Sequence, residues 1–191
     1  MKKISLFSSI MLLSACVTTQ TTSVDMPEKI EHNGQIYYLA NQQNLGEMQR
    51  YFYLKQGEST QHWQSAVDIL LDLNKGNRSM TERIALRKKV FEKNRITNFE
   101  LTEKDNALYA YVIYPPNDKE NNYQIDVAKG KNSAECGFAQ IQYSQKIESP
   151  GELDLLHPDS KYGKLRRNAK KTLAELAQFN WHCHPFDHKT P

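Results

Sequence analysis

Apolar and polar residues alternate along several short stretches of the chain, which is the pattern of β-strands with one buried face. The clearest stretch is Trp63–Leu73, where Val67, Ile69 and Leu71 share one face and polar residues such as Asp68 share the other. We therefore predict a strand over these residues. Turn-forming residues separate it from further strands predicted over the ranges 36–40, 48–54, 96–102, 108–114, 123–128 and 135–147.

Two helices are predicted between and after these strands. Ser79 and Glu82 have the spacing of a capping box, so the first helix begins there and runs to about residue 94. Its predicted inner face is formed by Ile84, Val90 and Phe91. Its predicted solvated face is formed by Arg83, Arg87, Lys88 and Glu92. The second helix runs from Asp159 or Ser160 to about Phe179, because apolar residues recur there at helical spacing.

This order of elements predicts an α+β fold, with a mostly antiparallel sheet of about six to seven strands flanked by two main helices. The element order over residues 35–180, and a strand beginning His62-Trp63-Gln64-Ser65-Ala66-Val67, resemble the Mog1/PsbP-like fold. That fold mostly serves as a binding or assembly scaffold. The resemblance therefore favours a non-enzymatic role.

The N-terminus has a different pattern, in which two lysines precede the apolar segment Ile4–Leu13. This ten-residue segment is too short to span a bilayer, which takes roughly 20 apolar residues, and it is typical of a secretory signal. Its end, Leu13-Ser14-Ala15-Cys16, resembles the lipobox of bacterial lipoproteins. In that family cleavage precedes the cysteine, which then carries diacylglycerol and a palmitate-type acyl chain. The alternative is an ordinary secretory signal with a chance cysteine.

We therefore expect three parts: a lipoprotein signal peptide over residues 1–15, a flexible membrane tether over 16–34, and a single domain over 35–191. In lipoproteins of enteric-type bacteria, Asp directly after the lipidated cysteine favours retention in the inner membrane. Here Val17 stands at that position, so the resemblance favours the outer membrane. The expected location is the cell envelope, on the periplasmic face or the surface of the outer membrane.

The net charge bears on whether the protein binds nucleic acid, and the cysteine content bears on disulfide formation. The formal net charge is +3, and removal of Lys2 and Lys3 with the signal lowers it to +1, which gives no argument for nucleic acid. Cys136 and Cys183 remain besides Cys16. In an oxidising periplasm we predict a Cys136–Cys183 disulfide, with two separate buried thiols as the alternative.

The second helix carries a cluster of basic residues with no acidic residue among them: Lys161, Lys164, Arg166, Arg167, Lys170 and Lys171. A basic helix face near a lipid anchor can bind anionic headgroups or an acidic partner, and each basic residue near such a surface adds about 1 kcal/mol. The alternative is a solvated face opposite the apolar stripe of the helix.

The C-terminal tail contains His182, His184 and His188, which are candidate ligands for zinc or copper. Their spacing matches no structural zinc pattern, and a chain terminus is a poor place for a preformed site. We therefore predict no metal and no cofactor.

Tyrosines recur on the predicted strands, where core packing is favoured over an exposed interface: Tyr37, Tyr38, Tyr51, Tyr53, Tyr109, Tyr111 and Tyr114.

No catalytic motif stands in the chain: it lacks a nucleophile elbow, a zinc-protease motif and a glycine-rich phosphate loop. Asp68 and Asp72 share a face of their predicted strand, as pairs on solvated strands often do. The leading hypothesis is a lipid-anchored, non-enzymatic envelope module that binds a partner protein or an envelope polymer. The alternatives are an enzyme acting on an envelope or extracellular substrate, which a polar cleft with converging carboxylates would favour, and a metal-binding lipoprotein.

Overall fold

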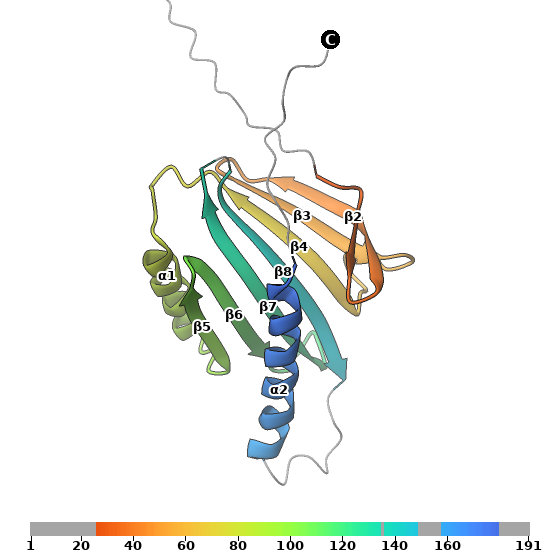
Figure 1. The fold of residues 1–191 in the computed structure, drawn as a ribbon. Coiled ribbons are helices and arrows are strands. Elements are labelled where there is room, and N and C mark those ends of the chain that lie inside the picture. The colour runs from red at the N-terminus through yellow and green to blue at the C-terminus, as the bar shows by residue number, and fades with distance from the viewer. Residues whose placement is uncertain (1–25, 135, 149–157, 180–191) are drawn as a thin grey trace, which may run out of the picture.

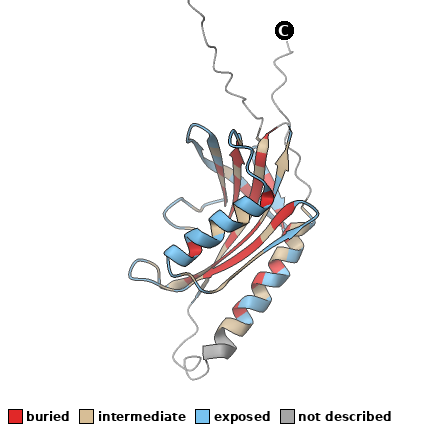
Figure 2. Cartoon of the chain, turned by 90° about the vertical axis from the view of Figure 1, so that its left-hand side faces the viewer, coloured by how far each residue is buried: buried red, intermediate tan, exposed pale blue. Residues whose placement is uncertain are grey.

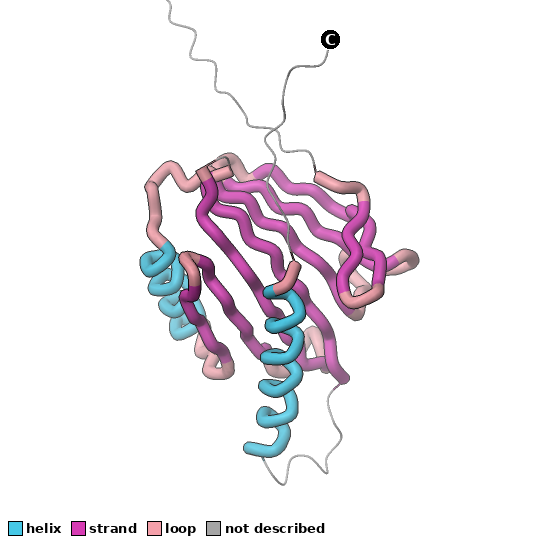
Figure 3. Tube along the Cα trace, viewed as in Figure 1, coloured by secondary structure: helices cyan, strands magenta, loops and turns pink. Residues whose placement is uncertain are grey.

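The computed structural model describes residues 26–134, 136–148 and 158–179. Within them the chain forms eight strands: β1 (Lys29–His32), β2 (Gln35–Asn44), β3 (Met48–Lys55), β4 (Ser65–Asp72), β5 (Phe99–Lys104), β6 (Ala107–Tyr114), β7 (Asn122–Ser133) and β8 (Gly137–Glu148). The helices are α1 (Met80–Lys93), between β4 and β5, and α2 (Pro158–Ala177), after β8. Figures 1 and 3 show their arrangement.

All eight strands belong to one antiparallel sheet with the order β1-β2-β3-β4-β8-β7-β6-β5. Each half of the sheet is a four-stranded meander, and the two halves meet where β4 pairs with β8. This architecture confirms the predicted α+β class, with an antiparallel sheet and two main helices. The strand count is eight where six to seven were expected.

The additional strand is β1, which lies inside the segment 16–34 that we interpreted as a membrane tether. β1 pairs with β2, and its residues Ile30 and His32 are buried. The tether prediction is therefore wrong for residues 29–32. A four-residue strand with a single aliphatic side chain has no recognisable alternation, so the sequence pattern could not identify it. Residues 1–25, including the predicted signal and Cys16, lie outside the described residues.

The β7–β8 hairpin also differs from the prediction. The range 130–133, between the predicted strands 123–128 and 135–147, was expected to form the turn, but it continues β7. Gly130 pairs with Gln140 inside the ladder. A Cβ atom at Gly130 would lie 2.5 Å from Cζ of Phe138. The glycine therefore makes room for the phenylalanine ring of the neighbouring strand, and it does not mark a chain reversal.

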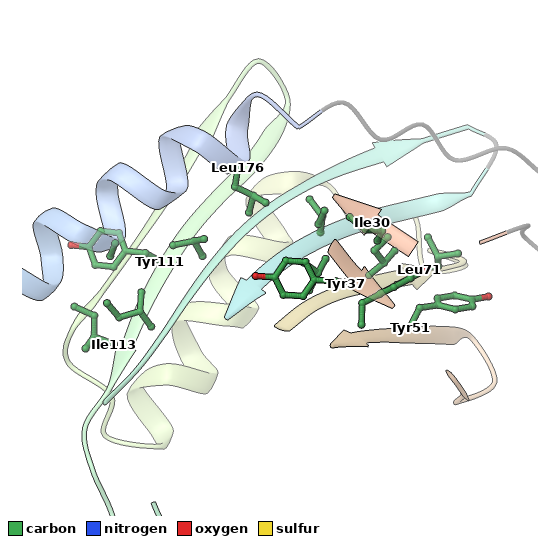
Figure 4. Close-up of a cluster of buried hydrophobic side chains, with 14 of the residues drawn as sticks. Ile30, Tyr37, Tyr51, Leu71, Tyr111, Ile113 and Leu176 are labelled. Carbon is green, nitrogen blue, oxygen red and sulfur yellow. The ribbon is translucent and has the colours of Figure 1, made fainter. Parts of the chain in front are cut away.

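One face of the sheet, which we call the inner face, carries the main hydrophobic core. Its buried strand residues include Tyr37, Tyr53, Val67, Ile69, Ile125 and Val127. α2 lies across β6 and β7 on this face and contributes Leu165, Ala169 and Leu176. Figure 4 shows tyrosine and aliphatic side chains from several strands in one layer with Leu176. Core packing is confirmed for Tyr37, Tyr51, Tyr53 and Tyr111, whereas Tyr38 is exposed.

The β1–β2 hairpin folds back toward the C-terminal end of α2. Nδ2 of Asn33 donates a hydrogen bond to Oε2 of Glu175 at 3.0 Å. The ring of His32 lies 6.4 Å from the ring of Phe179, between centroids. From the sheet, Nζ of Lys129 donates to the carbonyl oxygen of Ala177 at 2.7 Å, where the last turn of a helix lacks internal donors. The end of α2 is thus held by both halves of the sheet.

α1 lies on the opposite, outer face, against β5 and β6. The predicted capping box is present: the hydroxyl of Ser79 accepts from the backbone N–H of Glu82, and the Glu82 carboxylate accepts from the backbone N–H of Ser79. Met80 packs with Leu108 and Phe138 in a small second cluster. Neither α1 nor the described part of α2 is long and apolar enough to cross a membrane.

The predicted faces of α1 are partly wrong. Val90 was expected inside but is 53% exposed. Arg83 and Arg87 were expected in solvent, yet they turn toward the sheet: Arg83 donates to Asp72 at 2.9 Å and Arg87 to Gln140 at 2.6 Å. Polar side chains of β4 and β8 lie beside the small apolar cluster beneath α1, so these arginines serve there as packing partners. Figure 2 shows that most of α1 is exposed.

The packing of α2 can be tested with two Leu→Ala changes. Leu176 is fully buried against the sheet, whereas Leu86 on α1 is 49% exposed. We expect Leu176→Ala to lower the free energy of unfolding by about 3 kcal/mol, because it leaves a cavity in the core. Leu86→Ala should change it by less than about 0.5 kcal/mol. Urea denaturation followed by circular dichroism measures both. Equal effects of the two changes would contradict this placement of α2.

Candidate functional site

The outer face of the sheet carries a row of polar side chains on its central strands. Strand register places Asp68 of β4 beside Gln142 of β8, and Ser144 of β8 beside Asp126 of β7. Polar residues on the uncovered face of an antiparallel sheet are usually solvated. Here, however, Asp68 and Asp126 are only 8% and 7% exposed. Asp126 therefore lies in a recess of the sheet surface, and Asp68 lies next to it beneath Arg50.

Two adjoining hollows form this recess, which we call the polar groove. The first has a volume of about 340 Å³. Its neutral polar lining includes Asn41, Gln43, Gln124, Gln142 and Ser144. The second has a volume of about 310 Å³ and continues toward the β6–β7 connection, where Tyr114 and Asn117 line it. Both hollows are lined by Gln124 and Asp126, so Asp126 lies at their junction.

Asp126 is the most deeply set ionisable group of the groove. Its Oδ1 accepts a hydrogen bond from the Gln124 side-chain amide at 2.8 Å, and its Oδ2 accepts one from the Gln142 amide at 3.1 Å. Burial raises the pKa of Asp126 to about 6, although hydrogen bonds from Gln124 and Ser144 act in the opposite direction. This carboxyl group therefore changes its charge, and its ability to donate a hydrogen bond, close to neutral pH.

Asp68 is paired with Arg50 of β3. Nε and Nη2 of Arg50 both contact Oδ2 of Asp68, the former at 2.6 Å. The other oxygen, Oδ1, is buried without a hydrogen-bond partner in the described part of the chain. Burial raises the pKa of Asp68, and the guanidinium group opposes that shift. The Arg50 side chain remains 44% exposed, so its other N–H groups face the groove.

Aromatic side chains form a further part of the groove lining. Trp63 and Phe52 meet edge to face, with ring centroids 6.0 Å apart. Nζ of Lys146 lies 4.7 Å from the Trp63 ring and 2.8 Å from Oε1 of Glu120. The two cations of the groove, Arg50 and Lys146, are thus each paired with a carboxylate.

The neighbouring part of the outer face is closed by α1. Asp72 accepts from Arg83 and from the backbone N–H of Asn74. Burial opposes ionisation of Asp72, but these hydrogen bonds and the nearby arginines hold its pKa below the ordinary value. Asp68 and Asp72 do share a face, as predicted, but the expectation of a solvated pair is wrong because each is buried against an arginine.

The basic cluster of the last helix lies away from the groove, because α2 packs on the inner face. Two of its members hold the helix to the sheet: Lys170 forms a 2.8 Å ion pair with Glu100, and Arg166 donates to Asn98 at 2.8 Å. Lys171 lies 3.9 Å from Glu175. Lys164 and Arg167 are exposed. The side chain of Lys161 lies outside the described residues.

The other predicted site residues are only partly within the described structure. Cys136 is buried and disulfide-bonded. Its predicted partner Cys183 lies outside the described residues, as do the tail histidines, so the Cys136–Cys183 pairing stays a prediction. The described residues contain no group of three or more His, Cys, Asp or Glu side chains arranged to hold a metal ion.

Sequence reasoning missed most of the groove. Asp126, Gln124 and Gln142 were not singled out, although each alternates with core residues on its strand. The available signal was this alternation on two neighbouring strands, Tyr123–Ala128 and Ala139–Tyr143, in which every polar position falls on one face. It becomes informative only once the β7–β8 register is known, because the register brings the polar positions together.

Comparison with known proteins shows the family of the chain. A protein family model matches residues 24–181. An uncharacterized protein of Haemophilus influenzae is 34% identical over 182 residues, which cover 92% of this chain and 92% of the relative. The chain therefore belongs to this family, together with the Haemophilus protein. No solved structure matches the chain.

The pKa of Asp126 gives a test of the groove. Because its folded-state pKa of about 6 exceeds the unfolded value of about 3.9, protonated Asp126 stabilises the fold at low pH. That contribution, roughly 3 kcal/mol, is lost as the pH rises from about 4 through 6. Asp126→Asn should remove this loss, which urea denaturation across the pH range measures. Asp105→Asn, in the exposed β5–β6 turn, is the matched control. Identical profiles for wild type and Asp126→Asn would contradict the assignment.

Proposed function

We propose that this protein is a lipid-anchored protein of the bacterial cell envelope, and that its folded domain is a binding module for an envelope polymer. The N-terminal segment ending in Leu13-Ser14-Ala15-Cys16 supports the anchor. The observation that carries the binding role is the polar groove, in which neutral amide side chains surround the buried carboxyl group of Asp126. Recognition sites combine such convergent polar groups with apolar walls.

A binding role is favoured over catalysis by the way the groove residues contact one another. The hydroxyl of Ser144 accepts from the Gln142 amide at 3.2 Å, and no imidazole lines either hollow in the described structure. Ser144 therefore has no base of the kind that activates a serine nucleophile. Both oxygens of Asp126 are oriented by amides, as suits a fixed hydrogen-bonding group.

An enzyme acting on an envelope or extracellular substrate is the second candidate. One observation favours it: a carboxyl group with a pKa of about 6 can act as a general acid near neutral pH. In that case the protein would chemically modify the polymer that is bound in the groove. Product analysis after prolonged incubation separates the two candidates, because a binding module returns the polymer unchanged.

The outer surface of α2 supports a second contact, with an acidic protein or an anionic envelope surface. Its described basic side chains are all exposed, and Lys164 and Arg167 are available for such a contact, while Arg166 is bonded to Asn98 and Lys170 to Glu100. Because α2 and the groove lie on opposite faces, both surfaces can be occupied at once. The expected location remains the outer membrane.

The anchor is tested by metabolic labelling with an alkyne-bearing palmitate. The wild-type protein should incorporate the label and partition into detergent, and Cys16→Ala should do neither, because only the cysteine thiol can form the thioether to diacylglycerol. Cys136→Ala is the matched cysteine control and should retain the label. Labelling of the Cys16→Ala protein would overturn the lipoprotein assignment.

The binding role is tested by co-sedimentation of the purified full chain with insoluble envelope polymer. Wild type should pellet with the polymer, and Asp126→Asn should bind at least tenfold more weakly, because a hydrogen bond to a charged group contributes about 1.5–3 kcal/mol. Asp105→Asn should bind like wild type. Equal sedimentation of the two variants would overturn the role of the groove.

A further inference from the structure

The two hollows of the polar groove together make an elongated site. The first hollow reaches Asn41 on β2, the second reaches Tyr114 on β6, and Asp126 lines both. These ends lie on the first and last of six neighbouring strands, which are five strand steps apart. At about 4.8 Å per strand step, the groove spans roughly 24 Å across the sheet. Each hollow alone is at the small end of the ligand-pocket range of roughly 300–1,000 Å³, so the shape suits a chain of small units.

The charges of the groove argue against a polyanion. Arg50 is paired with Asp68, and Lys146 is paired with Glu120. Asp126 adds a further negative charge above its pKa of about 6. A site for a phosphate-rich or uronate-rich polymer would need unpaired cations, because such binding rests on neutralising the ligand charge. The charges of the groove therefore suit an uncharged polymer better than a polyanion.

The position on a sheet face argues against a polypeptide. Extended peptides usually bind at a sheet edge, where free backbone N–H and C=O groups pair with them. The groove lies over β4, β8 and β7, whose backbone groups are already paired with neighbouring strands. Side chains alone are available here, and most of those in the first hollow are neutral amides and hydroxyls.

Amides, a carboxyl group and aromatic rings match the chemistry of a sugar chain. Sugar hydroxyls both donate and accept hydrogen bonds, as the amides of Gln124 and Gln142 can in return. Asp126 accepts hydrogen bonds when it is ionised and can also donate one when it is protonated. A sugar ring also has apolar C–H faces, which pack on aromatic side chains such as Trp63.

We propose that the polar groove binds an uncharged linear glycan, which runs across the strands past Asp126, where the two hollows meet, and packs a sugar ring on Trp63. This inference rests on the proposed function and specifies its ligand class. It implies that affinity grows with chain length, because a longer glycan occupies both hollows.

The test is isothermal titration calorimetry on the purified full chain. The ligands are cello-, malto- and chito-oligosaccharides of two, four and six units, with oligogalacturonates of equal length as charged counterparts. We expect at least one uncharged series to bind with an affinity that rises at least tenfold from two to six units. Trp63→Ala should weaken binding of the hexamer at least tenfold. Gln43→Ala, which changes an exposed residue of the groove lining, should have an effect of the same size. Tyr38→Ala, an exposed aromatic residue outside the groove, should leave it unchanged.

Three outcomes would overturn the glycan assignment: no binding of any uncharged hexamer, tighter binding of the oligogalacturonates, or affinity independent of chain length. Unchanged hexamer binding by both Gln43→Ala and Trp63→Ala would overturn the placement in the groove. If envelope polymer still sediments with the protein in an Asp126-dependent manner, only the ligand class is wrong. Loss of that sedimentation as well would remove the proposed function itself.

Discussion

The pairing of β4 with β8 joins the two halves of the molecule, and the rest of the structure depends on its register. Eight residue pairs connect the strands, from Ser65 with Gln145 to Asp72 with Phe138. In this register Val67 and Ile69 of β4 lie beside Tyr143 and Ile141 of β8 on the inner face, while Asp68 and Gln142 lie side by side on the outer face. A slip of one residue would send carboxylates into the core and apolar side chains into water. The register of β4 and β8 therefore determines both the core and the groove.

Local patterns predicted what depends on neighbours in the chain, including the capping box at Ser79, the strand around Ile69 and the extent of α2. They failed where a distant element decides the environment. Arg83 is buried because a carboxylate of β4 lies beneath α1, and Gly130 is a strand residue because the Phe138 ring packs beside it. The groove falls in this second category, since its lining residues come from five strands and two connecting loops. Period-two alternation identifies their faces, but only the strand order brings those faces together.

Burying Asp68 and Asp126 on a face that could have been apolar costs stability, because a desolvated carboxylate is compensated only by well-placed donors. The chain supplies these donors from side chains: Arg50 to one carboxylate, and two glutamines to the other. Such an arrangement is typical of sites where recognition, more than folding, determines the residues. The inner face of the sheet differs, because tyrosines and aliphatic residues fill it and form the hydrophobic core.

The inclusion of β1 in the sheet has a consequence for how far the domain can stand from a membrane. Met26 already packs against the core, so only nine residues, 17–25, lie between it and Cys16. The ten Cα–Cα steps from Cys16 to Met26 cannot extend beyond about 36 Å. If Cys16 is the lipid attachment point, this segment is a short tether between the membrane and the domain. The domain can then sample only a thin layer next to the bilayer, and any polymer that it holds must pass through that layer.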